Sequence, residues 1–205
     1  MYINGTSNII GICGEIGSIP KFNHRSHGEN FYEMTVNVKR ISDKVDSLIV
    51  TCPNSVYEYI NENCYLGDMV HIDGEIRSFQ MDKEDGSKKL CLRIFATSVC
   101  IDENATIGFN EVELTGYVCK KPVLRKTPLG RDIADVIIAL NRTCGKSDYI
   151  PCIAWGRFSK VLSEKESGEK VTIRGRFQSR QYHKKLEDGT IEERTAYEVS
   201  ASYVE

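Results

Sequence analysis

The sequence predicts an all-β protein made of two tandem five-stranded Greek-key barrels, each with one short helix. Apolar residues recur at every second position in short runs, which is typical of half-buried strands. The chain has 205 residues, which suffices for two small domains. Its second half repeats the pattern of the first at an offset of 102 residues, which becomes 101 after a one-residue deletion. Such a period is too long for a solenoid unit and indicates two copies of one domain.

The two copies align over most of their length, glycine on glycine and apolar residue on apolar residue. Examples are Gly14 with Gly116, Pro20 with Pro122, Val36 with Ile138, Asp46 with Asp148, and Gly74 with Gly175. We therefore expect one domain over residues 1–104 and a second over residues 109–205, rather than one large domain.

The first three strands of each copy follow from this alternation. In the second copy, apolar residues alternate over residues 112–118 and again over 134–140, with a polar loop containing Pro and Gly between them. A third strand is expected over residues 149–154. It leads into a short helix.

The helix and the last two strands complete each copy. In the first copy, Ser55 and Glu58 have capping-box spacing, and a glycine after each helix predicts a left-handed C-cap. The fourth strand, over residues 171–177 in the second copy, is joined to the fifth by a hairpin with an Asp-Gly tip. Five strands with a helix after the third is the order of the OB-fold, a partly open barrel that binds oligonucleotides or oligosaccharides. The glycines at 74 and 175 suit tight bends where such a barrel curls.

The net charge of −2 conceals two different modules. Residues 1–105 carry 10 Lys and Arg against 15 Asp and Glu, and residues 106–205 carry 17 against 14, so the charges are −5 and +3. Attraction to phosphates depends on local charge because salt screens beyond roughly 10 Å. We expect the basic residues of the second copy to contact phosphates. They are Arg125, Lys126, Arg131, Arg174, Arg176, Arg180, Lys184 and Lys185.

Aromatic residues are interleaved with these cations. Tyr149 and Trp155 flank the third strand, and Tyr182 lies in the basic hairpin. Cations that follow phosphates and rings that stack on unpaired bases together favour a single strand of nucleic acid. Two alternatives remain open. Trp155 could be anchored in the core, and the charges around Tyr182 could form a face that contacts only solvent. Alternation along the fourth strand predicts that Arg174 and Arg176 share one face.

Four stretches of the second copy carry a family resemblance: residues 113–118, 134–140, 149–157 and 168–177. They resemble the DNA-binding domain of bacterial single-stranded DNA-binding proteins. In that family, stacking aromatics lie at positions that match Tyr149, Trp155 and Tyr182, whereas a further aromatic after the second strand has no counterpart near Thr143. The resemblance implies non-enzymatic, largely sequence-independent binding and protection of single-stranded DNA in replication, recombination or repair. It also implies an assembly of four OB-folds, which a homodimer of this tandem chain would supply.

The first copy matches the same framework more weakly. Its residues at the three aromatic positions are Ser47, Pro53 and Met81. Phe79 is a candidate DNA-binding residue that could compensate for them, as could other phenylalanines nearby. Our hypothesis is that the first copy has drifted toward a structural or pairing role.

Other functions are less well supported by the sequence. A primosome-type OB-fold adaptor, which mainly docks replication proteins, is the alternative that the acidic first copy favours. Family members recruit replication proteins through an acidic C-terminal tip, but the last residues here have the pattern of a strand, so we do not expect recruitment by that route. No catalytic motif indicates an enzyme, and an RNA ligand stays open because stacking does not read the 2′-hydroxyl.

The eight cysteines fit no C-x₂-C pair. Since no secretory signal is visible, we interpret them as reduced small hydrophobes, with disulfides or structural zinc as alternatives. We expect no metal or other cofactor. No apolar run is long enough to span a membrane, and the expected location is the cytoplasm, at the nucleoid.

Overall fold

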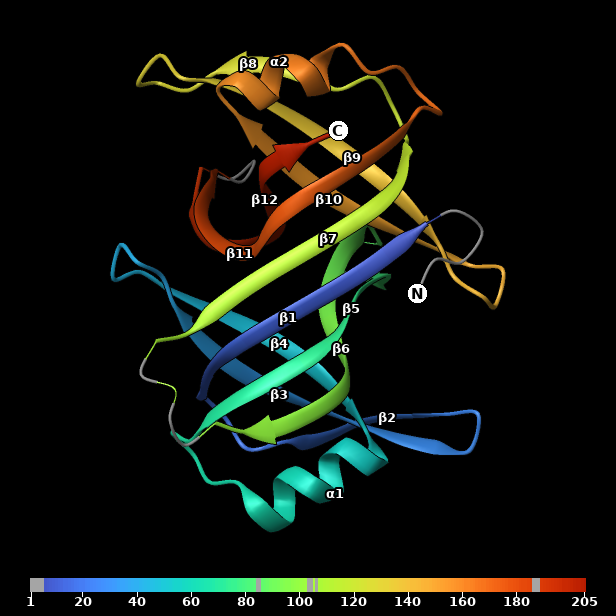
Figure 1. The fold of residues 1–205 in the computed structure, drawn as a ribbon, viewed down its shortest axis with the longest axis vertical. Coiled ribbons are helices and arrows are strands. Elements are labelled where there is room, and N and C mark those ends of the chain that lie inside the picture. The colour runs from blue at the N-terminus through green and yellow to red at the C-terminus, as the bar shows by residue number, and fades with distance from the viewer. Residues whose placement is uncertain (1–5, 84–85, 103–104, 106, 186–188) are drawn as a thin grey trace.

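The computed structural model describes residues 6–83, 86–102, 105, 107–185 and 189–205. Within these residues, twelve strands form one continuous sheet in the order β2-β3-β4-β6-β5-β1-β7-β11-β12-β10-β9-β8. Pairing of β3 with β1 closes one end of this sheet into a barrel, and pairing of β7 with β9 closes the other. Two tandem OB-fold barrels result, as predicted (Figure 1).

The first barrel contains the elements up to β6. They are β1 (Ser7–Ile16), β2 (Lys21–Ser26), β3 (Glu29–Lys39), β4 (Val45–Pro53), α1 (Asn54–Asn63), β5 (Met69–Asp82) and β6 (Lys88–Ile101). Strand β4 pairs in parallel with β6, whereas the other pairs are antiparallel.

The second barrel repeats this order. Its elements are β7 (Phe109–Val118), β8 (Val123–Lys126), β9 (Asp132–Asn141), β10 (Ser147–Trp155), α2 (Arg157–Ser163), β11 (Lys170–Lys185) and β12 (Ile191–Val204). Strand β8 lies in the region that the sequence predicts as a polar loop. All four of its side chains are exposed, so the strand has no alternation of burial to reveal it, and it forms because its backbone pairs with the edge of β9.

The predicted helix signals are wrong in detail. Helix α1 has Pro53 as its N-cap with no side-chain capping bond, and the Asn54 amide donates to the Glu58 carboxylate at 2.7 Å. The glycines lie beyond the helix ends. Gly67 and Gly168 turn the chain at positive φ so that their N–H groups donate to the carbonyls at the ends of β1 and β7.

The glycines at 74 and 175 do mark the bends of the barrels, as predicted. The pairing register shifts at each, and a Cβ there would collide with the carbonyl oxygen of Phe95 or Ser200 on the neighbouring strand. The predicted hairpin tips fall partly outside the described residues, since Asp85 and Asp188 are not among them.

Both barrels are filled by the inward-facing side chains of their strands. Residues with no exposed surface include Ile12, Leu48, Ile72 and Ile94 in the first barrel, and Leu114, Ile138, Ile173 and Phe177 in the second. Cys13, Cys52, Cys91 and Cys152 are also buried, as small hydrophobes, and all eight cysteines are free thiols.

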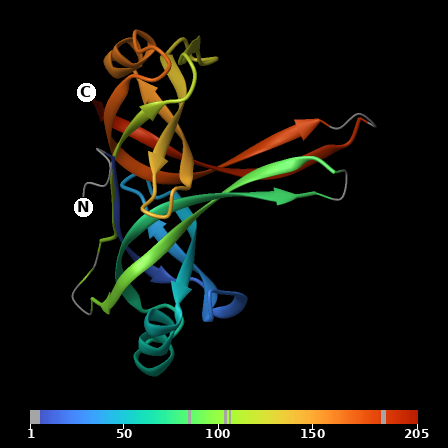
Figure 2. The same cartoon turned by 90° about the vertical axis from the view of Figure 1, so that its right-hand side faces the viewer.

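The barrels are joined edge to edge. Strands β1 and β7 pair antiparallel from Ser7 opposite Thr115 to Cys13 opposite Phe109. One sheet face therefore runs without a break across both barrels. We call it the outer face. The long hairpins β5–β6 and β11–β12 project on the other side, roughly parallel to each other (Figure 2).

A buried carboxylate adds a second connection. Asp46 in β4 is 1% exposed and accepts hydrogen bonds from Arg40 (Nε, 2.6 Å) and from the Ser179 N–H of β11 (2.8 Å). Arg40 also donates to the Ser179 carbonyl at 3.1 Å. We call this arrangement the Asp46 lock; it ties the β3–β4 hairpin of one barrel to β11 of the other.

The duplication repeats this arrangement in reverse, as the Asp148 lock. Asp148 in β10 is fully buried and accepts from Arg142 (Nε, 2.6 Å) and from the Ser78 N–H of β5 (2.6 Å). Arg142 donates to the Ser78 carbonyl, and Arg77 adds an ion pair to Asp148 at 3.1 Å. Each barrel thus inserts one hairpin against the projecting hairpin of the other.

No helix within the described part of the chain is both long and apolar enough to cross a membrane.

Candidate nucleic-acid interface

A polar cleft of about 820 Å³ lies between the barrels, beside the Asp46 lock. Strands β10, β11 and β12 form one side of it, and the β3–β4 hairpin of the first barrel forms the other. We call it the basic cleft. Its main side chains are Arg40, Lys44, Trp155, Arg176, Arg180 and Tyr197.

Trp155 lies at this cleft rather than in the core. It ends β10, is 38% exposed, and its indole N–H donates to the Ser200 hydroxyl at 3.3 Å. The hydrogen bond fixes the edge of the ring, so that part of the ring remains open to the cleft. A fixed, partly open ring can stack on an unpaired base.

The cations around the cleft are crowded. Arg176 is half-buried, and burial together with the nearby Arg40 guanidinium lowers its pKa, although it stays protonated. Arg180 lies 3.5 Å from the Glu198 carboxylate, with its guanidinium 5.6 Å from the centre of the Tyr182 ring. Positive charges held close together in a cleft attract an anionic ligand such as a phosphate chain.

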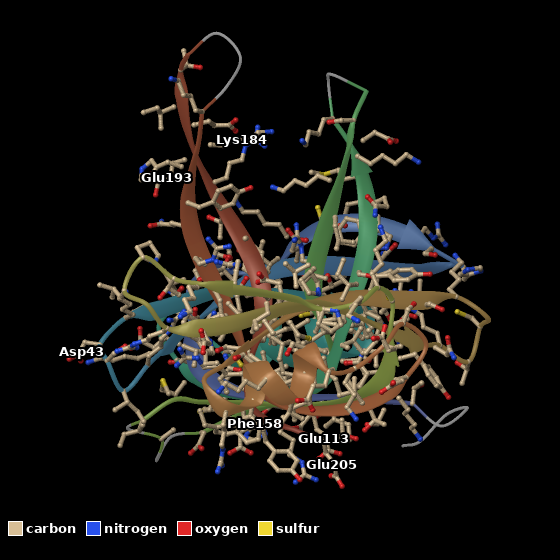
Figure 3. The ribbon with its side chains drawn as sticks, turned by 90° about the horizontal axis from the view of Figure 1, so that it is seen from above. Asp43, Glu113, Phe158, Lys184, Glu193 and Glu205 are labelled. Carbon is tan, nitrogen blue, oxygen red and sulfur yellow. The ribbon has the colours of Figure 1, made fainter. Side chains whose placement is uncertain are left out.

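The outer half of the β11–β12 hairpin carries Tyr182, Lys184 and Lys185. Across the hairpin, Lys184 is opposite Glu192, and Figure 3 shows Lys184 and Glu193 on its projecting arm. The hairpin is therefore less basic than its first strand alone suggests. Tyr182 is half-buried opposite Arg194.

Arg174 is separated from the basic cleft. The chain bends at Gly175, and Arg174 pairs with Glu113 of β7 at 2.7 Å and lies over the Tyr203 ring on the outer face. Figure 3 shows Glu113 on the side opposite to the projecting hairpin that carries Lys184. Arg174 and Arg176 both point away from the buried face of Val171 and Ile173, as alternation predicts, but the bend at Gly175 separates them onto two surfaces.

The remaining predicted residues of the second copy lie apart from the cleft. Arg125 and Lys126 are in β8 at the end of the sheet, and Arg131 is in the loop that follows. Arg125 is bound by both carboxylate oxygens of Asp135, which compensates its charge. Tyr149 is the third residue of β10 and is 48% exposed, and its backbone N–H donates to the Ser78 hydroxyl at 2.8 Å.

Phe79 belongs to a second cleft, of about 500 Å³, beside the Asp148 lock. It is 44% exposed, and the Arg93 guanidinium lies 5.5 Å from its ring centre. We call this the aromatic cleft. Its main side chains are Phe31, Phe79, Phe95, Arg77, Arg93 and Arg142.

Sequence reasoning missed the residues that one barrel contributes to the cleft of the other. Arg40 and Lys44 are in the acidic first copy, yet they line the basic cleft. A signal was available, because the pair Arg40 and Asp46 recurs as Arg142 and Asp148 at the repeat offset. A cation and an anion duplicated at the same spacing indicate a shared structural role.

Among the described residues, no group of three or more His, Cys, Asp and Glu is placed to hold a metal ion.

Comparison with known structures supports the fold over the whole chain. The single-stranded DNA-binding protein of Thermus aquaticus superposes with a TM-score of 0.79 at 19% identity, over 98% of this chain and 92% of that one. At this identity the likeness concerns the fold alone.

Sequence comparison identifies relatives. Single-stranded DNA-binding protein A of Bacillus subtilis is 35% identical over 80 residues, which are 36% of this chain and 46% of that protein. Protein B of the same organism is 33% identical over 81 residues, 36% of this chain and 72% of that protein. The match spans about half the length of protein A and of further relatives from Listeria. Residues 109–205 match the single-strand binding protein family, and together with the relative covered over 72% of its length this shows that the chain belongs to that family.

Proposed function

We propose that this chain binds and protects single-stranded DNA, largely without regard to sequence, and catalyses no reaction. The basic cleft carries the proposal. A partly open tryptophan lies beside four cations there, and the described residues that line the cleft include no carboxylate. This combination suits a flexible chain of phosphates and unpaired bases.

The binding residues that we propose are those at the basic cleft and along the adjoining hairpin. Trp155 and Tyr182 would stack on bases there, while the cations would contact phosphates. Tyr149, on β10 apart from the cleft, would offer a further stacking surface. The cations are Arg40, Lys44, Arg176, Arg180, Lys184 and Lys185. Family membership favours this function over that of an adaptor that mainly docks proteins.

A titration tests the proposal directly, because Trp155 is the single tryptophan of the chain. Adding oligo-dT should quench its fluorescence, and affinity should fall steeply as salt is raised, by about 0.7 log units per log unit of salt for each phosphate contact. An unquenched tryptophan and a flat salt response would contradict the function and the site together.

We further propose that the functional unit is a homodimer with four barrels, built from one domain up to residue 104 and a second from residue 109. The end of β6 at Ile101 and the start of β7 at Phe109 support these boundaries. Apolar side chains on the outer face support the dimer: Ile9 is 46% exposed, Phe109 37% and Tyr203 38%. Such a protein would act in replication, recombination or repair, in the cytoplasm at the nucleoid.

A further inference from the structure

The aromatic cleft stands where the duplication places the counterpart of the basic cleft. Ser78 and Ser179 are equivalent at the offset of 101, and each lies at its cleft beside an arginine from the opposite barrel. At the next position, however, the first barrel has Phe79 and the second has Arg180. The two clefts share a framework, but a ring replaces a cation in the first barrel.

Three rings of the aromatic cleft contact one another, and Phe79 lines the same cleft. The Phe31 and Phe95 ring centres are 5.9 Å apart, and the His24 ring stacks on Phe31 at 5.0 Å with an angle of 15°. Phe79 is the most exposed of the three phenylalanines at 44%. These rings come from β2, β3, β5 and β6, so four strands hold them in place.

The arginines here lie over rings and are partly neutralised. Arg93 lies over Phe79 and donates to Glu33 at 2.8 Å, while Arg77 lies 5.8 Å from the Phe95 ring centre and pairs with Asp148. Paired cations attract phosphates less than free ones do, yet guanidinium planes and rings both offer flat surfaces to a base.

We propose that the aromatic cleft is a second single-strand site, at which stacking on unpaired bases rather than attraction of phosphates supplies most of the binding. The proposal rests on the proposed function of single-stranded DNA binding. Under it, the first barrel binds DNA itself and does not have a purely structural role. The second barrel completes the site with Arg142, held at the cleft by the Asp148 lock.

Two exposed cysteines allow a direct test on the unmodified chain. Cys144 lines the aromatic cleft, whereas Cys100 is near the end of β6, opposite His71 of the outer face. Burial raises the pKa of Cys52 to about 12 and also raises that of Cys152, so these thiols should react slowly. Alkylation by a maleimide, followed residue by residue by mass spectrometry, should slow at least about tenfold at Cys144 when oligo-dT saturates the protein. The rate at Cys100 should not change.

The outcomes separate this proposal from the function itself. If Trp155 is quenched by oligo-dT while Cys144 reacts at its free rate, the second site is absent and the function stands. If neither residue responds, both proposals are overturned.

A matched pair of variants tests the nature of the binding. Phe79→Ala should weaken oligo-dT binding roughly 5- to 150-fold, the equivalent of one lost stack, without changing the salt slope. Arg180→Ala, at the equivalent position, should reduce the slope, by at most about 0.7 because Glu198 partly compensates the charge of Arg180. Phe79→Trp should restore the affinity. Full affinity in Phe79→Ala, or no rescue by Phe79→Trp in a folded protein, would overturn the stacking role.

Discussion

At the scale of single residues, a ring contributes to binding only when its face is accessible and its edge is fixed. Trp155 meets both conditions, since Ser200 holds its indole N–H and 38% of its surface is exposed. A ring that is already ordered loses little conformational freedom when a base stacks on it. This separates Trp155 from an exposed ring such as that of Phe22, which has no group that can form such a hydrogen bond.

Trp155→Ala should therefore weaken oligo-dT binding by about 1–3 kcal/mol, whereas Trp155→Phe should retain most of the affinity. Anisotropy of a labelled oligonucleotide measures both. The control is Tyr59→Ala, because Tyr59 is also 38% exposed but lies on α1, away from both clefts. An equal loss of oligo-dT affinity in the control would contradict the site. Unfolding of Trp155→Ala would show that Trp155 is a core residue instead.

Whether a cation contributes to DNA binding depends on the surface where it lies, not on the copy of the domain that contains it. Lys44 belongs to the acidic copy but lines the basic cleft, whereas Arg174 belongs to the basic copy but pairs with Glu113 on the outer face. A cation that a carboxylate already neutralises contributes less to phosphate binding, and so to counterion release, than an unpaired cation close to the bound DNA.

Lys44→Ala should reduce the slope of log affinity against log salt by about 0.7, and Arg174→Ala should leave it unchanged. Titrations with oligo-dT at four or five salt concentrations provide both slopes. The reverse result, a smaller slope in Arg174→Ala alone, would indicate that the DNA binds on the outer face instead.

At the scale of elements, the strands could be predicted because alternation reports which side chains enter a barrel core. The order of five strands and a helix, and the bends at Gly74 and Gly175, follow from local pattern. Strand β8 could not be predicted, since its side chains are all exposed and only its backbone pairing defines it.

The clefts were predictable only in part. Trp155 is on β10 and Arg176 and Arg180 are on β11, two strands of one barrel that both pair with β12. The resemblance and the charge pattern therefore suffice to find these three residues. Arg40 contacts Ser179 across 139 positions of sequence, and no local pattern reports such a contact. The same holds for Phe31 and Phe95, which line one cleft with Phe79 only after the barrel closes.

The Asp148 lock should matter for stability because several donors depend on one buried carboxylate. They are Arg142, Arg77 and the Ser78 N–H. Asp148→Asn keeps the shape but removes the charge that Arg142 and Arg77 bind. We expect a loss of roughly 2–4 kcal/mol in the free energy of unfolding, toward the lower part of the range for buried pairs because the arginines reach solvent. Urea denaturation measures this loss.

Asp43→Asn provides the matched control. Asp43 forms an exposed ion pair with Lys39 at 2.9 Å, and exposed pairs contribute about 0–1 kcal/mol. Asparagine also tolerates the φ of 62° at this position. Equal effects of the two substitutions would show that the buried lock does not stabilise the joint between the barrels.

At the scale of the whole molecule, the two barrels form one body with two different surfaces. The locks and the β1–β7 pairing fix the clefts and the projecting hairpins relative to each other. The opposite surface is the outer face. Across it, Ile9, Glu113, Arg174 and Tyr203 lie in one row over β1, β7, β11 and β12.

This row combines exposed apolar side chains with an ion pair, a composition that suits contact with a second copy of the same face. Ile9→Asp would place a charge among the apolar groups and beside Glu113. We expect the mass measured by native mass spectrometry to fall from twice the chain mass to 23.2 kDa. Ile41→Asp should leave the dimer intact, because Ile41 is fully exposed in the β3–β4 turn. A monomeric wild-type protein, or a dimer that survives Ile9→Asp, would contradict assembly through the outer face.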